Sequence, residues 1–224
     1  MIIEKRKGFT LIELLVVIAI IAMLLAILLP SLRAAKKQAQ AVVCRSNMCQ
    51  IGLAVNLYAE DYQSYIPRGI NSTGIYAWYN LFLPYLGKEY NDGDYRNVKI
   101  YRCLSYPDKN QTVCYVVNAM TDGIVEAKEP TKLNVFKHPQ STVYLADNED
   151  GEWREIIENN GDVGTDRLDV FRVSHLPGST IEVGIHGRRV ASKRHKDGSN
   201  YLFLAGHVDY IATEDMSIRY WRER

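Results

Sequence analysis

The sequence lacks an excess of charge of either sign. Its 224 residues carry 27 Lys and Arg residues against 26 Asp and Glu residues. A nucleic-acid-binding domain usually needs a clear basic excess to contact phosphates, so the totals argue against a nucleic-acid partner. Hydrophobic residues make up 47% of the chain and charged residues 24%, which is typical of a folded domain and excludes a largely disordered chain.

The sequence also lacks the short motifs that carry common catalytic chemistry. It contains no Gly-x-Ser-x-Gly turn, no His-Glu-x-x-His pair, no Cys-x-x-Cys pair and no glycine-rich phosphate loop before a lysine. Single Ser, His and Asp residues occur, but their spacing does not assemble a catalytic set. We therefore expect no enzymatic activity.

The strongest positive feature is an apolar run near the amino terminus. Residues 14–29 contain no charged or polar side chain, and Leu11 and Ile12 extend the run to 19 residues with one interruption, Glu13. At about 1.5 Å per helical residue this run covers roughly 28 Å, close to the hydrocarbon thickness of a bilayer. A secretory signal peptide would have a shorter apolar region and a small-residue cleavage site. The run therefore predicts a membrane-spanning helix.

The residues around the start of this run form a recognisable pattern. Three basic residues, Lys5, Arg6 and Lys7, come first, and basic residues also follow the run, so charge alone gives no orientation. The pattern reads Lys7-Gly8-Phe9-Thr10-Leu11-Ile12-Glu13-Leu14-Leu15. It resembles the leader and processing site of type IV pilins and type II secretion pseudopilins nearly residue for residue.

The resemblance implies a processing pathway. A prepilin peptidase would remove the leader, residues 1–8, by cutting after Gly8, and would then methylate the new amino group of Phe9. Gly8 suits this step because it lets an extended backbone approach the protease without a side chain in the way. The resemblance further implies a single-pass protein of the inner membrane, with a cytoplasmic amino terminus and an extracytoplasmic domain.

Glu13 is the one charged residue inside the apolar run. A carboxylate in a membrane span is costly, so a partner and a function are expected for it. In the pilin family the equivalent carboxylate pairs with the methylated amino terminus of a neighbouring subunit during assembly. The alternative is a carboxylate near the helix start that reaches the headgroups and is stabilised by the helix dipole.

After the apolar run we expect a second helical segment. Pro30 is predicted to kink or break the helix. We therefore divide the helical region into a transmembrane stem, residues 9–30, and an amphipathic arm, residues 31–64, followed by a globular domain, residues 65–224. The arm has small and apolar residues at three- and four-residue spacing, which predicts the face that docks on a sheet. This predicted face comprises Leu32, Ala35, Ala39, Val42, Ser46, Cys49, Leu53 and Leu57.

Later segments resemble a subgroup of pilin-like proteins more loosely. They are Cys44 to Ala54, Trp78 to Gly87, Tyr101 to Ser105, Cys114 to Asn118 and His195 to Asp209. The last segment is similar to a signature of His, nine residues, then Asp-Gly, but Ala205 replaces the Asp. Because Asp-Gly is a preferred type I′ hairpin turn, Ala205 is predicted to weaken the turn or change its type.

Four cysteines make disulfides plausible if the domain is exported. Cys44 and Cys49 are five residues apart on one helix, about 8 Å between Cα atoms, so they cannot pair with each other. The resemblance places the subgroup's two usual cysteines at Cys44 and Cys103, which implies a bridge from arm to sheet, with Cys49 and Cys114 as a second pair. A local bridge between Cys103 and Cys114, or free buried thiols, are the alternatives.

The globular part reads as a β-rich domain. Turn-forming clusters of Gly, Pro, Asn and Asp separate short β-prone runs. These runs are residues 100–103, 113–117, 142–146, 167–173, 180–183, 201–204 and 208–211. The predicted fold class is α+β and pilin-like, with a long amino-terminal helix packed on an antiparallel sheet.

Two sets of residues suggest metal sites. His195 and His207 would lie on opposite strands of one hairpin, roughly 30 Å apart, so we interpret each as a hairpin or surface residue and predict no shared metal. The acidic run at Asp147, Glu149 and Asp150 could wrap calcium through oxygen ligands, but its register does not match the EF-hand pattern. A solvated acidic loop is the favoured interpretation, and no cofactor is expected.

These features together predict a structural subunit of a type IV pilus-like or type II secretion pseudopilus filament. Its expected partners are prepilin peptidase, other pilin or pseudopilin subunits and an inner-membrane assembly platform. The alternative is a membrane-tethered extracytoplasmic binding domain whose 15 tyrosines would recognise a sugar or a secreted substrate. That alternative predicts a large exposed aromatic patch and no self-assembly.

Overall fold

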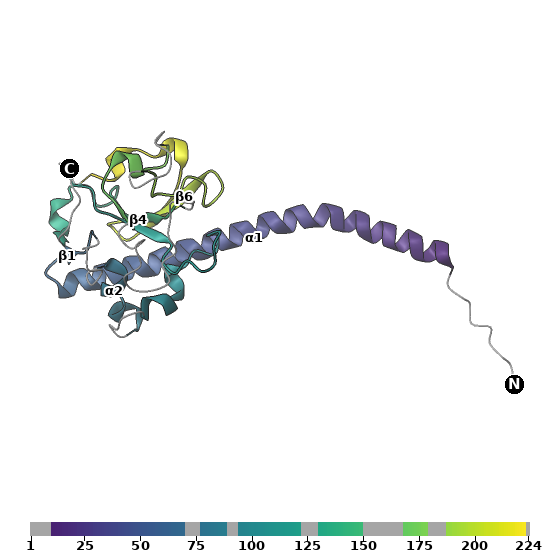
Figure 1. Ribbon diagram of the computed structural model, residues 1–224, viewed down its shortest axis with the longest axis horizontal. Coiled ribbons are helices and arrows are strands. Elements are labelled where there is room, and N and C mark those ends of the chain that lie inside the picture. Colours follow the sequence, from purple (N-terminus) through teal and green to yellow (C-terminus); the bar gives the residue numbers. More distant parts are fainter. Residues whose placement is uncertain are drawn as a thin grey trace. The chain divides into compact units, whose positions relative to one another are not determined.

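The computed structural model describes residues 10–69, 77–88, 94–121, 130–149, 168–178 and 187–222. The fold is α+β, as predicted: one long amino-terminal helix and a domain built on a five-stranded sheet (Figure 1). The chain divides into two compact units, Met1–Ala39 and Gln40–Arg224. The second unit contains the carboxy-terminal part of the long helix and the sheet.

The long helix, α1, runs from Leu11–Asp61 without interruption. Pro30 lies inside it, so the helix does not break there, and the kink at Pro30 stays a prediction. Proline lacks the N–H that would donate one turn back, but the helix bonds on either side remain. The Ser31 hydroxyl donates to the Leu28 carbonyl at 2.8 Å in the same turn. The stem and the arm are therefore parts of one helix.

The arm docks through a different face from the one predicted. The residues of α1 that are buried are Cys44, Met48, Ile51, Gly52, Ala54, Val55, Tyr58 and Ala59. Val42 and Leu53, which belong to the predicted face, are each 61% exposed. Both faces carry apolar residues at helical spacing, so periodicity could not choose between them. The face that docks is the one that brings Met48, Ile51 and Tyr58 into the core.

The sheet is mixed rather than purely antiparallel. The strands are β1 (Tyr65–Ile66), β2 (Tyr115–Asn118), β3 (Thr131–Lys132), β4 (Val143–Asp147), β5 (Asp169–Val170), β6 (Gly198–Phe203) and β7 (Val208–Ala212). The main sheet has the order β5-β2-β4-β6-β7, and β1 pairs with β3 separately. All of these pairs are antiparallel except β2 with β5, which is parallel. The prediction of an antiparallel sheet is wrong at this edge.

Short helices connect the strands. α2 is Trp78–Leu81, and the 3-10 helices are Pro84–Leu86, Asp94–Asn97, Lys99–Tyr101, Leu133–Val135, Val173–His175, Thr213–Asp215 and Ile218–Tyr220. The predicted strand at residues 100–103 is wrong, because the chain turns at Tyr101 to bury its ring edge-on against Trp78, with ring centroids 5.3 Å apart. The predicted strand at residues 180–183 lies outside the described residues.

The turn between β6 and β7 accommodates Ala205 without strain. Gly206 has a φ of 89°, while Ala205 is not among the described residues with positive φ. A type I′ turn would need positive φ at both central residues. The Phe203 N–H donates to the His207 carbonyl at 2.9 Å and closes a three-residue loop instead. The turn is therefore not of type I′, and the predicted effect of Ala205 on the turn stays a prediction.

Gly198 is a position where backbone packing leaves no room for a side chain. A Cβ there would lie 2.2 Å from the Ile211 carbonyl oxygen on β7. We expect Gly198→Ala to lower the free energy of unfolding by about 2 kcal/mol, because β6 and β7 must separate to admit the methyl group. Thermal unfolding of the full chain in detergent, followed by near-ultraviolet circular dichroism, measures this. Ala205→Gly in the exposed turn is the control, and an unchanged melting temperature for Gly198→Ala would contradict the prediction.

Candidate functional site

The apolar stem at the start of α1 is the first candidate site. Its large apolar side chains from Leu11 to Leu29 are exposed, and none of the most apolar stretch of the helix is buried within the structure. By length and composition α1 can cross a membrane. A core helix of a water-soluble domain would bury one face against other elements. The stem therefore presents an apolar surface that none of the described residues covers.

Glu13 and Thr10 form a reciprocal cap at the start of the stem. The Thr10 backbone N–H and the Thr10 hydroxyl each donate to Glu13 Oε2 at 2.8 Å. The Glu13 backbone N–H in turn contacts the Thr10 hydroxyl oxygen at 3.3 Å. This arrangement is a capping box. The spacing of Thr10 and Glu13, three residues apart, is the sequence signal for it, but the sequence alone did not lead us to predict it. Glu13 thus has a partner within its own chain, and its other oxygen, Oε1, accepts none of these bonds.

The processing residues predicted next to this cap lie outside the described residues. They are the basic leader residues Lys5, Arg6 and Lys7, the cleavage position Gly8 and the methylation position Phe9. Their roles stay predictions.

A buried cluster of sulfur, nitrogen and oxygen atoms is the second candidate site. Cys44 on α1 and Cys103 after the 3-10 helix Lys99–Tyr101 have their sulfur atoms 2.8 Å apart. His195 Nε2 lies 3.6 Å from Cys103 Sγ and 3.3 Å from Asp147 Oδ2. All four residues are buried, with at most 6% of any residue exposed. We call Cys44, Cys103, Asp147 and His195 the Cys-His-Asp cluster.

The pKa values of three side chains in this cluster are strongly shifted. Burial disfavours a charged His195, but hydrogen bonds to Asp147 and Cys44 outweigh burial and raise the pKa of His195 to about 9. A hydrogen bond from Cys103 lowers the pKa of Cys44 to about 5. The same hydrogen bond, together with burial, raises the pKa of Cys103 well above its usual range.

The cluster changes several sequence-based interpretations. His195 is not a surface residue, because it lies in the interior against Cys103 and Asp147. His207 is exposed and stacks on Phe203, as a surface residue would. Sequence spacing could not find the cluster, because its members come from segments separated by at least 44 residues.

The structure brings the cysteines of the first predicted pair close together but not those of the second. No disulfide is present among Cys44, Cys49, Cys103 and Cys114 in the structure. Cys44, Cys103 and Cys114 share one buried cluster, whereas Cys49 is exposed on α1. The second predicted pair, Cys49 with Cys114, is therefore not formed.

The described residues of the acidic run make separate contacts and do not converge on one site. Asp147 ends β4 and accepts the Asn200 backbone N–H at 2.8 Å through Oδ2. Glu149 Oε2 instead lies 3.7 Å from Arg188 Nε. Asp150 lies outside the described residues. The interpretation of a solvated acidic loop is wrong for Asp147 and Glu149, which are both buried.

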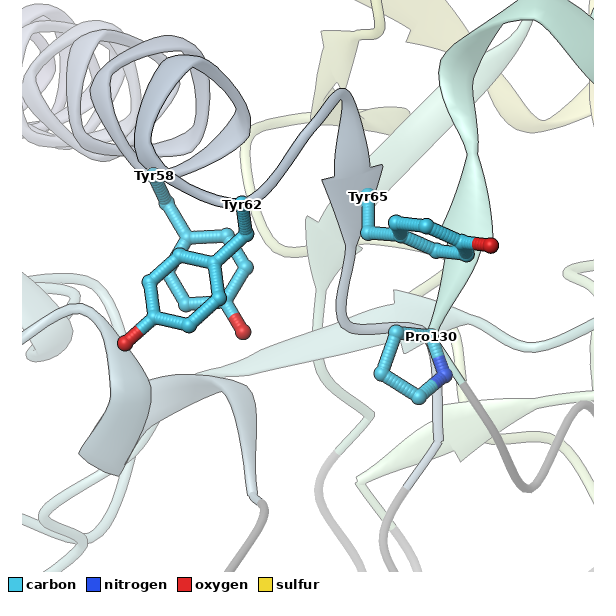
Figure 2. Close-up of a pocket in the computed structure, with 4 residues that line it drawn as sticks. All are labelled: Tyr58, Tyr62, Tyr65 and Pro130. Carbon is cyan, nitrogen blue, oxygen red and sulfur yellow. The ribbon is translucent and has the colours of Figure 1, made fainter.

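A pocket of about 440 Å³ lies beside the end of α1 (Figure 2). Its described lining residues are Tyr58, Tyr62, Tyr65 and Pro130. The rings of Tyr58 and Tyr62 stack with centroids 4.2 Å apart. This lining offers aromatic faces and hydroxyl groups but no carboxylate, thiol or imidazole for chemistry. The described lining of this pocket therefore contains no catalytic set.

Comparison with known proteins bears on the stem. Residues 4–29 match the family model described as the prokaryotic N-terminal methylation motif. The type IV wide pilus major component PilA4 of Thermus thermophilus is 49% identical over 77 residues, which cover 31% of this chain and 59% of that protein. The chain thus spans less than two thirds of that relative's length. No solved structure matches the chain.

These matches confirm the prepilin-type character of the amino-terminal segment that residues 7–15 predicted. The carboxy-terminal signature around Ala205 stays a prediction.

Proposed function

We propose that this chain, with its prepilin-type amino-terminal segment, is a structural subunit of a type IV pilus-like filament. It would be anchored in the inner membrane by the stem before assembly. Prepilin peptidase would cut after Gly8 and methylate Phe9, and an assembly platform in the inner membrane would add the subunit to the filament.

The observation that carries this proposal is the exposed stem of α1. Its apolar surface must be covered by lipid before assembly and by other stems afterwards. Packing among stems would replace lipid contacts with protein contacts around a common axis, as in other helical assemblies. A subunit that functioned alone would need the stem only as an anchor.

The arm supplies a second apolar surface for assembly. Leu53 and Leu57 point away from the face of α1 that packs into the domain, and both are exposed. Val42 and Val43 extend this apolar surface toward the stem. A neighbouring arm would cover these side chains and remove their apolar area from water, which is favourable.

The test is the mass and amino-terminal sequence of the protein recovered from membranes and from sheared surface material. We expect a chain that begins at N-methylated Phe9 in both fractions. A chain that still begins at Met1 in cells with active prepilin peptidase, and that occurs only in membranes, would overturn the proposal.

A membrane-tethered binding domain is the second candidate, and the tyrosine pocket favours it. Tyr62 and Tyr65 are exposed beside that pocket and could stack on a sugar ring. Among the residues that the structure describes, however, eight tyrosines are buried, which reduces the exposed aromatic patch that this function predicts. Two results would favour this candidate over the filament. The processed protein would occur only in membranes, and it would bind a labelled glycan saturably, with binding abolished by Tyr62→Ala.

A further inference from the structure

The Cys-His-Asp cluster has no part in the proposed filament contacts, yet it has the composition of a metal site. We propose that Cys44, Cys103, His195 and Asp147 bind one zinc ion. This proposal does not depend on the filament function, because it rests on side chains inside the second unit alone.

The donor atoms of the cluster are those that zinc prefers. Zinc is a borderline-soft cation that accepts thiolate sulfur, imidazole nitrogen and carboxylate oxygen in tetrahedral sites, and the cluster offers two, one and one of these donors. They come from four separate segments: α1, the loop after Tyr101, the end of β4 and the turn before β6. The Sγ and Nε2 atoms of Cys44, Cys103 and His195 all lie within 4.8 Å of one another.

Two of the measured separations already fit a zinc tetrahedron. Bonds of about 2.3 Å to sulfur and 2.1 Å to nitrogen and oxygen place S and N about 3.6 Å apart, and N and O about 3.4 Å apart. Cys103 Sγ and His195 Nε2 are 3.6 Å apart, and His195 Nε2 and Asp147 Oδ2 are 3.3 Å apart. The two sulfur atoms, at 2.8 Å, must separate by about 1 Å to reach the tetrahedral distance of about 3.8 Å.

Unsatisfied hydrogen-bonding groups in the cluster also favour the binding of a cation. Asp147 is fully buried, and its Oδ1 has no hydrogen-bond partner among the described residues. His195 Nε2 faces both Cys103 and Asp147, although one ring nitrogen can donate a single proton. A divalent ion would balance the buried negative charge, and binding would displace the protons of both thiols.

A disulfide between Cys44 and Cys103 is the competing outcome, and it explains less of the cluster. It would use only the two sulfur atoms and would leave His195 and Asp147 as a buried pair. Zinc uses all four side chains. The Asn200 N–H that donates to Asp147 would then orient the ligating carboxylate, as supporting contacts do in known zinc sites.

The proposed ion would fasten the arm to the sheet. Cys44 is on the buried face of α1, Asp147 ends the central strand β4, and His195 precedes β6. A zinc ion joining them would therefore cross-link these elements at one point of the interior. Because a structural zinc ion binds only the folded state tightly, its removal should lower stability.

The experiment is a metal analysis of the full chain, purified in detergent with a tag that contains no histidine and exchanged extensively after incubation with zinc. We expect one zinc ion per chain, and a lower melting temperature after dialysis against a chelator. Reconstitution with Co²⁺ should give the absorption bands of thiolate-bound tetrahedral cobalt. These measurements use the wild-type chain, so they do not depend on whether a variant folds.

Variants then assign the ligands. Cys103→Ser and His195→Gln should each lower bound zinc at least tenfold after exchange, whereas Cys49→Ser, which removes the exposed thiol of α1, and His207→Gln should retain it. Wild-type chain without zinc or cobalt bands would overturn the proposal, as would zinc content unchanged in Cys103→Ser and His195→Gln. A Cys44–Cys103 disulfide found by peptide mapping, in protein whose thiols were blocked at cell lysis, would overturn it as well.

Discussion

Glu13→Gln is expected to reduce the protein in the sheared surface fraction by at least tenfold while leaving its amount in membranes unchanged. Glutamine has nearly the shape of glutamate and can still accept the Thr10 bonds, but it cannot form an ion pair with the amino terminus of a neighbouring subunit. An unpaired charge at membrane depth costs on the order of 3 kcal/mol, so pairing can favour assembly by a similar amount. About 1.4 kcal/mol corresponds to a tenfold change in population. Quantitative immunoblots of both fractions measure the effect.

Two further variants separate assembly from helix capping. Glu60→Gln changes an exposed glutamate near the other end of α1 and should leave assembly unchanged. Thr10→Val removes the hydroxyl that bonds Glu13 but keeps the carboxylate, so assembly should persist. Normal filament levels of Glu13→Gln would contradict the assembly function of Glu13. If Thr10→Val and Glu13→Gln reduced assembly equally, assembly would instead depend on the helix cap.

Arg189→Met is expected to cause the largest loss of stability among single substitutions in the domain. Arg189 Nη1 forms an ion pair with Asp169 Oδ1, and both side chains are buried. Removing only the cation leaves the carboxylate of β5 in the interior without its ion-pair partner, which typically costs 3–5 kcal/mol. For a domain of this size we expect the melting temperature to fall by about 10 °C, as measured by near-ultraviolet circular dichroism.

A double-mutant cycle tests the physical cause. Asp169→Leu combined with Arg189→Met should recover more than half of the loss, because replacing both charges by apolar groups avoids breaking the buried ion pair from one side. Arg219→Met, at an exposed arginine, is the control and should change stability by less than about 0.5 kcal/mol. If the double variant were no more stable than Arg189→Met, lost packing rather than the broken ion pair would explain the effect.

Several parts of the fold could be predicted from local sequence. The end of α1 near Asp61 follows from the turn residues and Pro67 beyond it, and the hairpin of β6 and β7 follows from two β-prone runs around Ala205 and Gly206. These features depend on residues close together in the chain. The docking face of the arm could not be predicted, because both faces of that segment carry apolar residues and only the shape of the sheet distinguishes them.

The sequence by itself determined the stem and its prepilin-type start. A run of apolar residues favours lipid or other stems whatever the rest of the chain does, and a processing motif is read by an enzyme along an extended segment. Only the tertiary structure decided the parallel edge at β5, the buried pair of Asp169 and Arg189, and the Cys-His-Asp cluster. Each of these joins segments far apart in the chain, and their proximity is set by strand order and by core packing, which local periodicity does not encode.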